Sequence, residues 1–460
     1  MLALRAINMI SRRRFNQSLV TLAFTGLSRH LLASPSTVNE PPLLAYGKLL
    51  DDPNGLLDLP KGFSYKVISS LNEQMTDGLP VPDRADGMGC FYLDDDRVTL
   101  IRNHELLPEH QLVSKTNKEI DNLAYDSINN IHPLPGGTSN IIYNHKLQQV
   151  EHQFMSLIGT IRNCSGGITP WNTWLTCEES VAKADDKLSK DHGYIFEVPA
   201  NTTSMVKANP IIAMGRFNRE AACVDPRTGI VYMTEDRGDS LLYRFIPKVK
   251  GNLLQGGRLQ ALTIIDKPKF DTRNWNKALM PLNLPMKAHW INIDNPESPD
   301  DDLRLRGYNL GAALFARGEG IHWGNNELYF CCTNGGAKKL GQIMRYVPSP
   351  DEGESLENNA PGKLSLFVES KKKASLNFGD NITVAPNGHL IVCEDQYTDQ
   401  VDNHLKGVTK NGKTYDFARI RLQTESAGAC FSPDGKTLFV NLYSPTTTIA
   451  ITGPWDNFTH

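Results

Sequence analysis

The sequence lacks the features that mark several large classes of protein. Its 460 residues carry 48 basic and 51 acidic side chains, so there is no basic excess of the kind that binds nucleic acid. There is no G-x-S-x-G elbow, no H-E-x-x-H motif and no G-x-G-x-x-G dinucleotide loop. Helical periodicity is weak, and no apolar run is long enough for a spanning helix. We therefore expect neither nucleic-acid binding nor stable membrane insertion.

Cysteine is scarce for a disulfide framework. The eight cysteines are spread through long apolar runs, whereas small secreted scaffolds place theirs densely because they lack a large core. A chain of this length can bury a core without such crosslinks. We expect most of the cysteines to be small buried residues, with one or two available to bind a metal. They are Cys90, Cys164, Cys177, Cys223, Cys331, Cys332, Cys393 and Cys430.

The N-terminus carries a targeting signal. The segment SRRRFNQ (residues 11–17) precedes a short, mildly apolar stretch and a polar SPSTVNEPP segment, an order typical of twin-arginine export signals. We predict a signal peptide over residues 1–33, the export machinery as a partner, and a single catalytic domain over residues 34–460 in the periplasm or outside the cell. This route carries folded proteins, often because a cofactor is loaded first, so a metal site is worth seeking.

An internal repeat predicts the fold. Each copy places a short apolar strand on both sides of a tight turn, which is the pattern of a β-hairpin. Further strand-like segments flank the hairpins, so we predict an all-β protein, a six-bladed β-propeller with loop insertions. A pair of β-sandwiches is the alternative. Four copies are clear and two are looser: EAACVDPRTGIVYMTED (220–236), EGIHWGNNELYFCCTN (319–334), DNITVAPNGHLIVCED (380–395), ESAGACFSPDGKTLFVN (425–441), and residues 86–105 and 166–179.

Acidic residues recur at the ends of these copies. Because the inner strand of each propeller blade lines one channel, equivalent positions in different blades converge on the axis. Two carboxylates 4 Å apart at an effective dielectric constant of 20 repel by about 4 kcal/mol, so several together require protons or cations. The alternative is that each acid only satisfies backbone groups at a strand end. The acids are Glu220, Glu319, Asp380 and Glu425 at the start of copies, and Glu105, Glu178 and Asp395 at the end.

The residue types narrow the ions. Carboxylate and carbonyl oxygens suit calcium, whereas a thiolate from Cys177, in PWNTWLTCEES (170–180), favours iron or zinc. A buried apolar role for Cys177 stays open. Arg317 lies two residues before Glu319 and would offer a planar fork to a phosphate or carboxylate group. Arg162, Arg216 and Arg237 are weaker candidates of the same kind.

In its N-terminal segment and in the repeat copies quoted above, the chain resembles the PhoX-type alkaline phosphatases, which are exported by the twin-arginine route. The resemblance runs from residue 11 to about residue 445 and so covers nearly the whole chain. Its most specific block contains TWLTCEE. The blocks are SRRRF, RADGMGCF, RNHE, PGGTSN, RNCSGGITPWNTWLTCEES, GRFNREAACVDPRTGIVYMTEDRGDSLLYRF, FARGEGIHW, TNGG, FGDNITVAPNGHLIVCED and ESAGACFSPDGKTLFVNLYSP.

The resemblance implies a six-bladed propeller whose channel holds iron and calcium. It implies that Cys177 is the iron-binding thiolate and that Arg317 contacts the phosphate. The acidic metal ligands that it implies are Glu178, Glu220, Glu319 and Asp380, with Glu105, Asp395 and Glu425 in further matching blocks.

We therefore predict a phosphoric monoester hydrolase that acts on small phosphate esters with Fe3+ and Ca2+ as cofactors. Arg317, Cys177 and Glu319 would form its catalytic centre together with the metals. One alternative is a calcium-dependent propeller lactonase or phosphotriesterase, which needs no thiolate. Another is a non-catalytic binding propeller whose channel calcium is structural.

Overall fold

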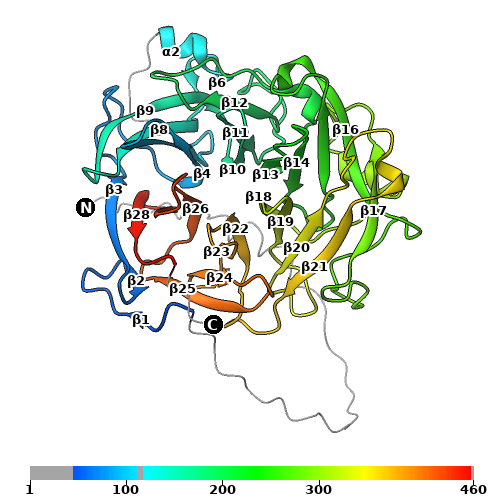
Figure 1. Ribbon diagram of the computed structural model, residues 1–460. Coiled ribbons are helices and arrows are strands. Elements are labelled where there is room, and N and C mark those ends of the chain that lie inside the picture. The colour runs from blue at the N-terminus through cyan, green and yellow to red at the C-terminus, as the bar shows by residue number, and fades with distance from the viewer. Residues whose placement is uncertain (1–44, 111–117, 397, 457–460) are drawn as a thin grey trace, which may run out of the picture.

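The fold is a ring of antiparallel sheets around one central axis (Figure 1). The computed structural model describes residues 45–110, 118–396 and 398–456, so the predicted signal peptide lies outside the described residues. Six inner strands stand around the centre, and each begins one radial unit whose later strands lie successively farther out. The prediction of an all-β propeller is confirmed, and the alternative of two sandwiches is wrong because the sheets radiate from one axis.

The six units follow one another along the chain. The first three, from inner to outer strand, are β4 (Ala85–Tyr92), β5 (Arg97–His104), β8 (Gly136–Asn144) and β9 (Gln149–Thr160); β10 (Asn163–Ile168), β11 (Thr173–Glu178) and β12 (Ile195–Pro199); and β13 (Arg219–Val224), β14 (Val231–Glu235), β15 (Tyr243–Pro247) and β16 (Gly257–Ile264). The other three are β18 (Gly318–Gly324), β19 (Glu327–Cys332), β20 (Gln342–Val347) and β21 (Lys363–Glu369); β22 (Gly379–Val384), β23 (Leu390–Glu394), β24 (His404–Val408) and β25 (Thr414–Ile420); and β26 (Ser426–Phe431), β27 (Thr437–Leu442), β28 (Thr447–Thr452) and β3 (Ser64–Ser70).

Chain ends and linking strands close the ring. Strand β3, near the N-terminus, pairs with β28, near the C-terminus, so both ends of the chain complete one sheet. Arg102 of β5 locks this junction, because its fully buried guanidinium donates to Ser69 of β3 at 3.1 Å and Thr448 of β28 at 2.6 Å. The remaining strands are β17 (Met286–Asn292), which joins β16 to β21, β1 (Leu49–Leu50) and β2 (Leu57–Pro60), which extend the fifth unit, and the small hairpin β6 (Ser127–Ile128) and β7 (His132–Pro133).

The core lies between the units. Six clusters of buried apolar side chains each combine residues of two adjacent units, so every interface of the ring has its own apolar layer. All eight cysteines are buried free thiols, as expected for a chain that needs no disulfide framework. Because β-sheet side chains alternate between faces, these layers fix which residues of each strand point sideways.

Loop insertions lie outside the strands. The long polar segment after β17 contains the helix α3 (Leu303–Leu310). The other described α-helix is α2 (Lys118–Leu123), and the described 3-10 turns are Ile212–Met214, Leu253–Gln255 and Glu357–Asn359. Within the described ranges, no helix has the length and apolar character needed to cross a membrane.

Candidate metal centre

Every inner strand carries the same irregularity. In each unit two residues of the inner strand stand opposite one residue of the next strand, which is a β-bulge. A bulge breaks the two-residue alternation and turns a side chain toward the channel. The first bulged residues are Asp86, Cys164, Glu220, Glu319, Asp380 and Gly428. Five of the six are therefore groups that can bind a metal.

Close packing of the inner strands explains the small residues that follow. A Cβ atom on Gly87 would stand 2.6 Å from the Cα of Ser165, and one on Gly320 would stand 2.8 Å from the Cα of Asn381. No real Cβ atom tolerates such distances to backbone, so these positions need glycine. The sequence pairs Asp86-Gly87 and Glu319-Gly320 thus place an acid at the bulge and, beside it, a residue without a side chain that lets the next inner strand approach.

The structure gathers these side chains into a buried arc. Four groups of three residues each have ligand atoms within 4.8 Å of one another. Neighbouring groups share a member, so the arc follows adjacent inner strands around the channel. The groups are Asp86, Glu105 and Cys164; Cys164, Glu179 and Glu220; Glu220, Glu319 and Asp380; and Asp380, Asp395 and Glu425. Six of the eight ligands predicted from the sequence belong to this arc.

The electrostatics of the arc favour bound cations. Burial, followed by the charges of Asp236, Asp380 and Glu220, raises the pKa of Glu319 well above its usual value, and Arg317 offsets only part of this. The Oε2 atom of Glu319 is buried and makes no hydrogen bond within the described chain. A cation would satisfy that oxygen and remove the repulsion at once.

Cys164 gives the arc a mixed donor set. Its Sγ lies 3.1 Å from Oε1 of Glu220 and 3.4 Å from Oδ2 of Asp86. Burial and then these two carboxylates raise the pKa of the thiol well above its usual value, whereas a bound metal would deprotonate it. The residues present fit one thiolate-bound transition metal beside oxygen-bound hard cations.

The prediction that Cys177 belongs to this site is wrong. Cys177 stands opposite the bulge of β10, pairs with Ile195 of β12, and points sideways into the apolar layer between the second and third units. Burial raises the pKa of its thiol to about 12, although Arg219 nearby acts in the opposite direction. The cysteine that belongs to the arc is Cys164, thirteen residues earlier.

The prediction for Glu178 is also wrong by one residue. Oε1 of Glu178 accepts from the backbone N–H of Ile161 at 3.0 Å and contacts Nδ1 of His192 at 2.6 Å, while Oε2 accepts from Gly193 at 2.8 Å. Glu178 therefore braces the loops that flank its unit. The adjacent Glu179 turns to the opposite face and joins the arc.

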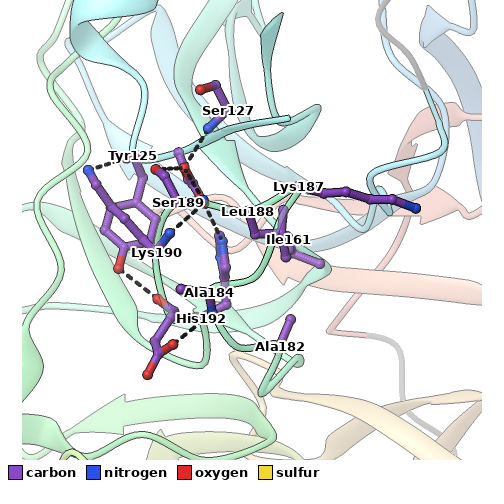
Figure 2. A network of polar contacts seen from close by, with 12 residues as sticks. Tyr125, Ser127, Ile161, Ala182, Ala184, Lys187, Leu188, Ser189, Lys190 and His192 are labelled. Atoms are coloured by element: carbon purple, nitrogen blue, oxygen red, sulfur yellow. Dashed lines mark hydrogen bonds and ion pairs between the residues drawn. The ribbon is translucent and has the colours of Figure 1, made fainter. Parts of the chain in front are cut away.

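A buried histidine links Glu178 to the first unit. His192 lies between two carboxylates, with Nε2 3.2 Å from Oδ2 of Asp126. Burial alone would lower the pKa of His192, but Glu178 and Asp126 outweigh it and raise the pKa to about 9. The segment 184–192 folds around this contact, and Figure 2 shows Ser189, Lys190 and His192 gathered beside Tyr125. This network is a support beneath Glu179.

Asparagines brace the bulges from behind. Asn441 donates to the backbone oxygen of Asp86 at 2.6 Å, and Asn103 donates to the backbone oxygen of Cys164 at 3.2 Å. Asn381 donates to Oδ1 of Asp380 at 3.1 Å. These contacts hold the bulged backbone in place. His104 has a similar structural role, because its ring nitrogens contact the Asp83 carbonyl and the Ser139 hydroxyl.

Partly exposed arginines lie at one edge of the arc, which we call its entrance. Arg317 forks onto Asp236 at 2.7 and 2.8 Å and donates to Oε1 of Glu319 at 3.0 Å, so the predicted arginine is at the site. Arg162 joins Glu105 and Glu179, at 2.7 Å from an oxygen of each. These guanidinium groups cross-link acids of the arc and its rim.

The other two predicted arginine candidates, Arg216 and Arg237, do not lie at the entrance of the arc. Arg216 is buried and donates to the backbone carbonyls of Val181, Ala182 and Ser298, so its role is structural. Arg237 pairs loosely with Asp301, at 3.7 Å.

Two of the residues missed from the sequence, Asp86 and Cys164, share a pattern that could have found them. Arg84-x-Asp86-Gly, Arg162-x-Cys164-Ser and Arg317-x-Glu319-Gly have the same spacing, and Asn218-x-Glu220-Ala differs only in its first residue. Superposing the copies on this spacing selects Asp86 and Cys164 directly. The hairpin turns used to define the repeat lie at the other end of each strand and do not.

The inner strands of this propeller carry a buried arc of metal-binding groups, and arginines lie beside it. This architecture is that of a metal-dependent propeller enzyme. The family model of alkaline phosphatase PhoX matches residues 44–138 and 137–446. The chain belongs to this family, and it is accordingly a metal-dependent phosphatase, a phosphoric monoester hydrolase.

One solved structure of the family agrees with the fold. PhoX of Pseudomonas fluorescens, in complex with the transition-state analogue vanadate, aligns over 90% of this chain and 98% of its own with 18% identity and a TM-score of 0.65. A gluconolactonase from Xanthomonas campestris aligns over the same shares with 10% identity and a TM-score of 0.41. No curated protein matches the chain.

Proposed function

We propose that this phosphatase is exported by the twin-arginine route and hydrolyses small phosphate esters at a centre of iron and calcium in the channel. The observation that carries this proposal is the buried arc, in which one thiol and eight carboxylates form four overlapping groups beside Arg317. The export signal at residues 11–17 supports the location, because a protein that folds around its metals before export needs a route for folded chains.

The donor types assign ions to parts of the arc. Cys164 with Glu179 and Glu220 offers sulfur and oxygen, which suits iron. The group of Asp380, Asp395 and Glu425 offers oxygen only, which suits calcium. When bound, these cations would supply Lewis-acid polarisation of the phosphoryl oxygens and an activated oxygen nucleophile.

The chain's own residues then have separate tasks. Arg317 would donate to phosphoryl oxygens and stabilise the charge that spreads over them during transfer. Asp236, which holds the Arg317 guanidinium through two hydrogen bonds, would keep it oriented. Burial of the arc excludes bulk water from the ligands, and this strengthens each electrostatic contact with the substrate.

Two cysteine variants test the proposal as a matched pair. We expect Cys164→Ser to lose most of its iron and to lower kcat/KM for an aryl phosphate by more than about a hundredfold. Cys177→Ala should keep both, because Cys177 lies in the apolar layer. Elemental analysis of protein purified without chelators provides the metal content.

The same pair separates other outcomes. A calcium-only enzyme, such as the lactonase alternative, would keep its metals and activity in Cys164→Ser. Loss of iron from Cys177→Ala but not from Cys164→Ser would contradict the proposed ligand set. Wild-type protein that contains calcium without iron would contradict the proposed metals.

A further inference from the structure

Three arginines occupy equivalent places in three units. Arg84, Arg162 and Arg317 each lie two residues before the first bulged residue of an inner strand. Each has a left-handed backbone, with φ of 58°, 51° and 49°. The carbonyl of each accepts from the backbone N–H of Glu105, Glu179 or Thr333, at 2.9, 2.9 and 3.0 Å. Because this conformation is strained for a residue with a side chain, the repeated hydrogen bond must hold it.

Two of these arginines are already engaged by carboxylates. Arg162 uses Nε and Nη2 on Glu105, at 3.1 and 2.7 Å, and Nη2 also on Glu179. Arg317 uses Nε and Nη2 on Asp236 and Nη2 also on Glu319. Their positive charge is therefore largely balanced by acids of the arc and its rim.

Arg84 differs from both. Its Nη1 donates to the phenol oxygen of Tyr443 at 2.9 Å, and the guanidinium lies 5.6 Å from the centre of that ring. Across the described residues, no carboxylate oxygen lies within 4.0 Å of its nitrogens, and Nε and Nη2 make no hydrogen bond. The side chain is half-buried. Among the described residues, Arg84 thus forms no direct ion pair and keeps donors to spare at the rim of the arc.

Tyr443 fixes where that charge stands. Its hydroxyl donates to Oε2 of Glu105 at 2.7 Å while it accepts from Arg84. Glu105 belongs to the first group of the arc, together with Asp86 and Cys164. One phenol oxygen therefore joins the guanidinium to a candidate metal ligand, and Arg84 stands directly at the edge of the site.

We propose that Arg84 is a substrate-binding residue that donates to a phosphoryl oxygen from the side of the entrance opposite Arg317. This assignment rests on the proposed function. Arg84 precedes β4 of the first unit and Arg317 precedes β18 of the fourth, so the two residues face each other across a ring of six. A phosphate monoester carries two negative charges and three peripheral oxygens, and it can accept from both guanidinium groups.

The test compares Arg84→Met, Arg84→Lys and a control, Arg419→Met, on the outer strand β25. All are full-length, metal-loaded proteins. We expect Arg84→Met to raise the Kd of inorganic phosphate, measured by calorimetry, and the KM of an aryl phosphate by about ten- to a hundredfold, with a smaller change in kcat. Arg84→Lys should recover part of the affinity because it keeps the charge but loses the fork. Metal content and the midpoint of unfolding should match the wild type, as should every property of Arg419→Met.

Two results would overturn the assignment alone. Phosphate binding by Arg84→Met that equals the wild type would show that Arg84 does not contact the anion. Parallel loss of bound metal would show that it only supports the arc. Failure of the metal-loaded wild type to bind or hydrolyse phosphate would instead overturn the proposed function, and the role of Arg84 with it.

Discussion

Removal of the metals should destabilise the protein in a way that depends on pH. Two carboxylate oxygens at 4.8 Å, the limit within each group of the arc, repel by about 3.5 kcal/mol at an effective dielectric constant of 20. The three pairs formed by ionised Glu220, Glu319 and Asp380 would then store about 10 kcal/mol at this distance, and more at shorter ones. Protonation or a bound cation relieves most of this repulsion.

The sign of the pH dependence follows from the shifted pKa values. The pKa of Glu319 in the folded protein lies well above the ordinary value of 4.5, so the folded metal-free protein binds protons more readily than the unfolded chain does. Its stability is therefore highest below the ordinary pKa and falls as the pH rises through the folded-state pKa. Bound cations remove this dependence because they take the place of the protons.

Calorimetry with and without a chelator measures the effect. At about pH 8 we expect chelation to lower the midpoint of thermal unfolding by about 5–10 °C, and at about pH 5.5 by clearly less. Excess calcium and iron added back should restore the midpoint. Glu319→Gln, which carries no charge at that position, should lose less on chelation at the higher pH. An equal loss at both pH values, or no loss at all, would refute the idea that the arc stores repulsion.

Three further predictions concern the supports of the site. Gly320→Ala should lower the unfolding midpoint and the metal content, because the new Cβ atom would stand 2.8 Å from a backbone Cα atom. The control Gly238→Ala, whose Cβ atom would stand 3.4 Å from a side-chain atom, should change neither. Equal midpoints of the two variants would contradict the close approach at Gly320. The pKa of His192 is raised from 6.5 to about 9, so its contribution of about 3 kcal/mol to the free energy of unfolding should be complete below pH 6.5 and be lost as the pH rises through 9. In denaturant titrations, His192→Gln should abolish this dependence of stability on pH. An unchanged dependence would assign the titration to another group. The eight buried cysteines should not react with a thiol reagent in the native protein and should all react after unfolding; rapid native labelling would show that the apolar layers open.

Much of the fold was predictable because the repeat is visible in the sequence. Each hairpin has its own turn residues and its own apolar strands, and these local signals need no knowledge of the neighbouring unit. The acids that begin copies, Glu220, Glu319 and Asp380, could likewise be located, because equivalent positions in a propeller must meet at the axis. Helix α3 was not predicted, since it lies in a polar insertion without an apolar periodicity.

The errors at the site lie within strands whose existence was predicted. Cys177 was chosen over Cys164, and Glu178 over Glu179, because adjacent residues of a strand face opposite ways and the sequence does not label the faces. The deciding feature is the bulge, which lets Cys164 face the channel and leaves Cys177 opposite to face the next unit.

The amino-acid sequence by itself determined the repeat, the β-propeller and the supply of carboxylates and thiols from which a metal site can be made. Only the tertiary structure decided which of those groups meet, and it left Arg84 with donors free at the entrance. The physical reason is that the bulges depend on contacts between neighbouring units, such as the approach of Gly87 to Ser165, and no single strand encodes such a contact. A shift of one residue in the register of an inner strand would point its acidic side chain into the apolar layer and its apolar side chains toward the axis.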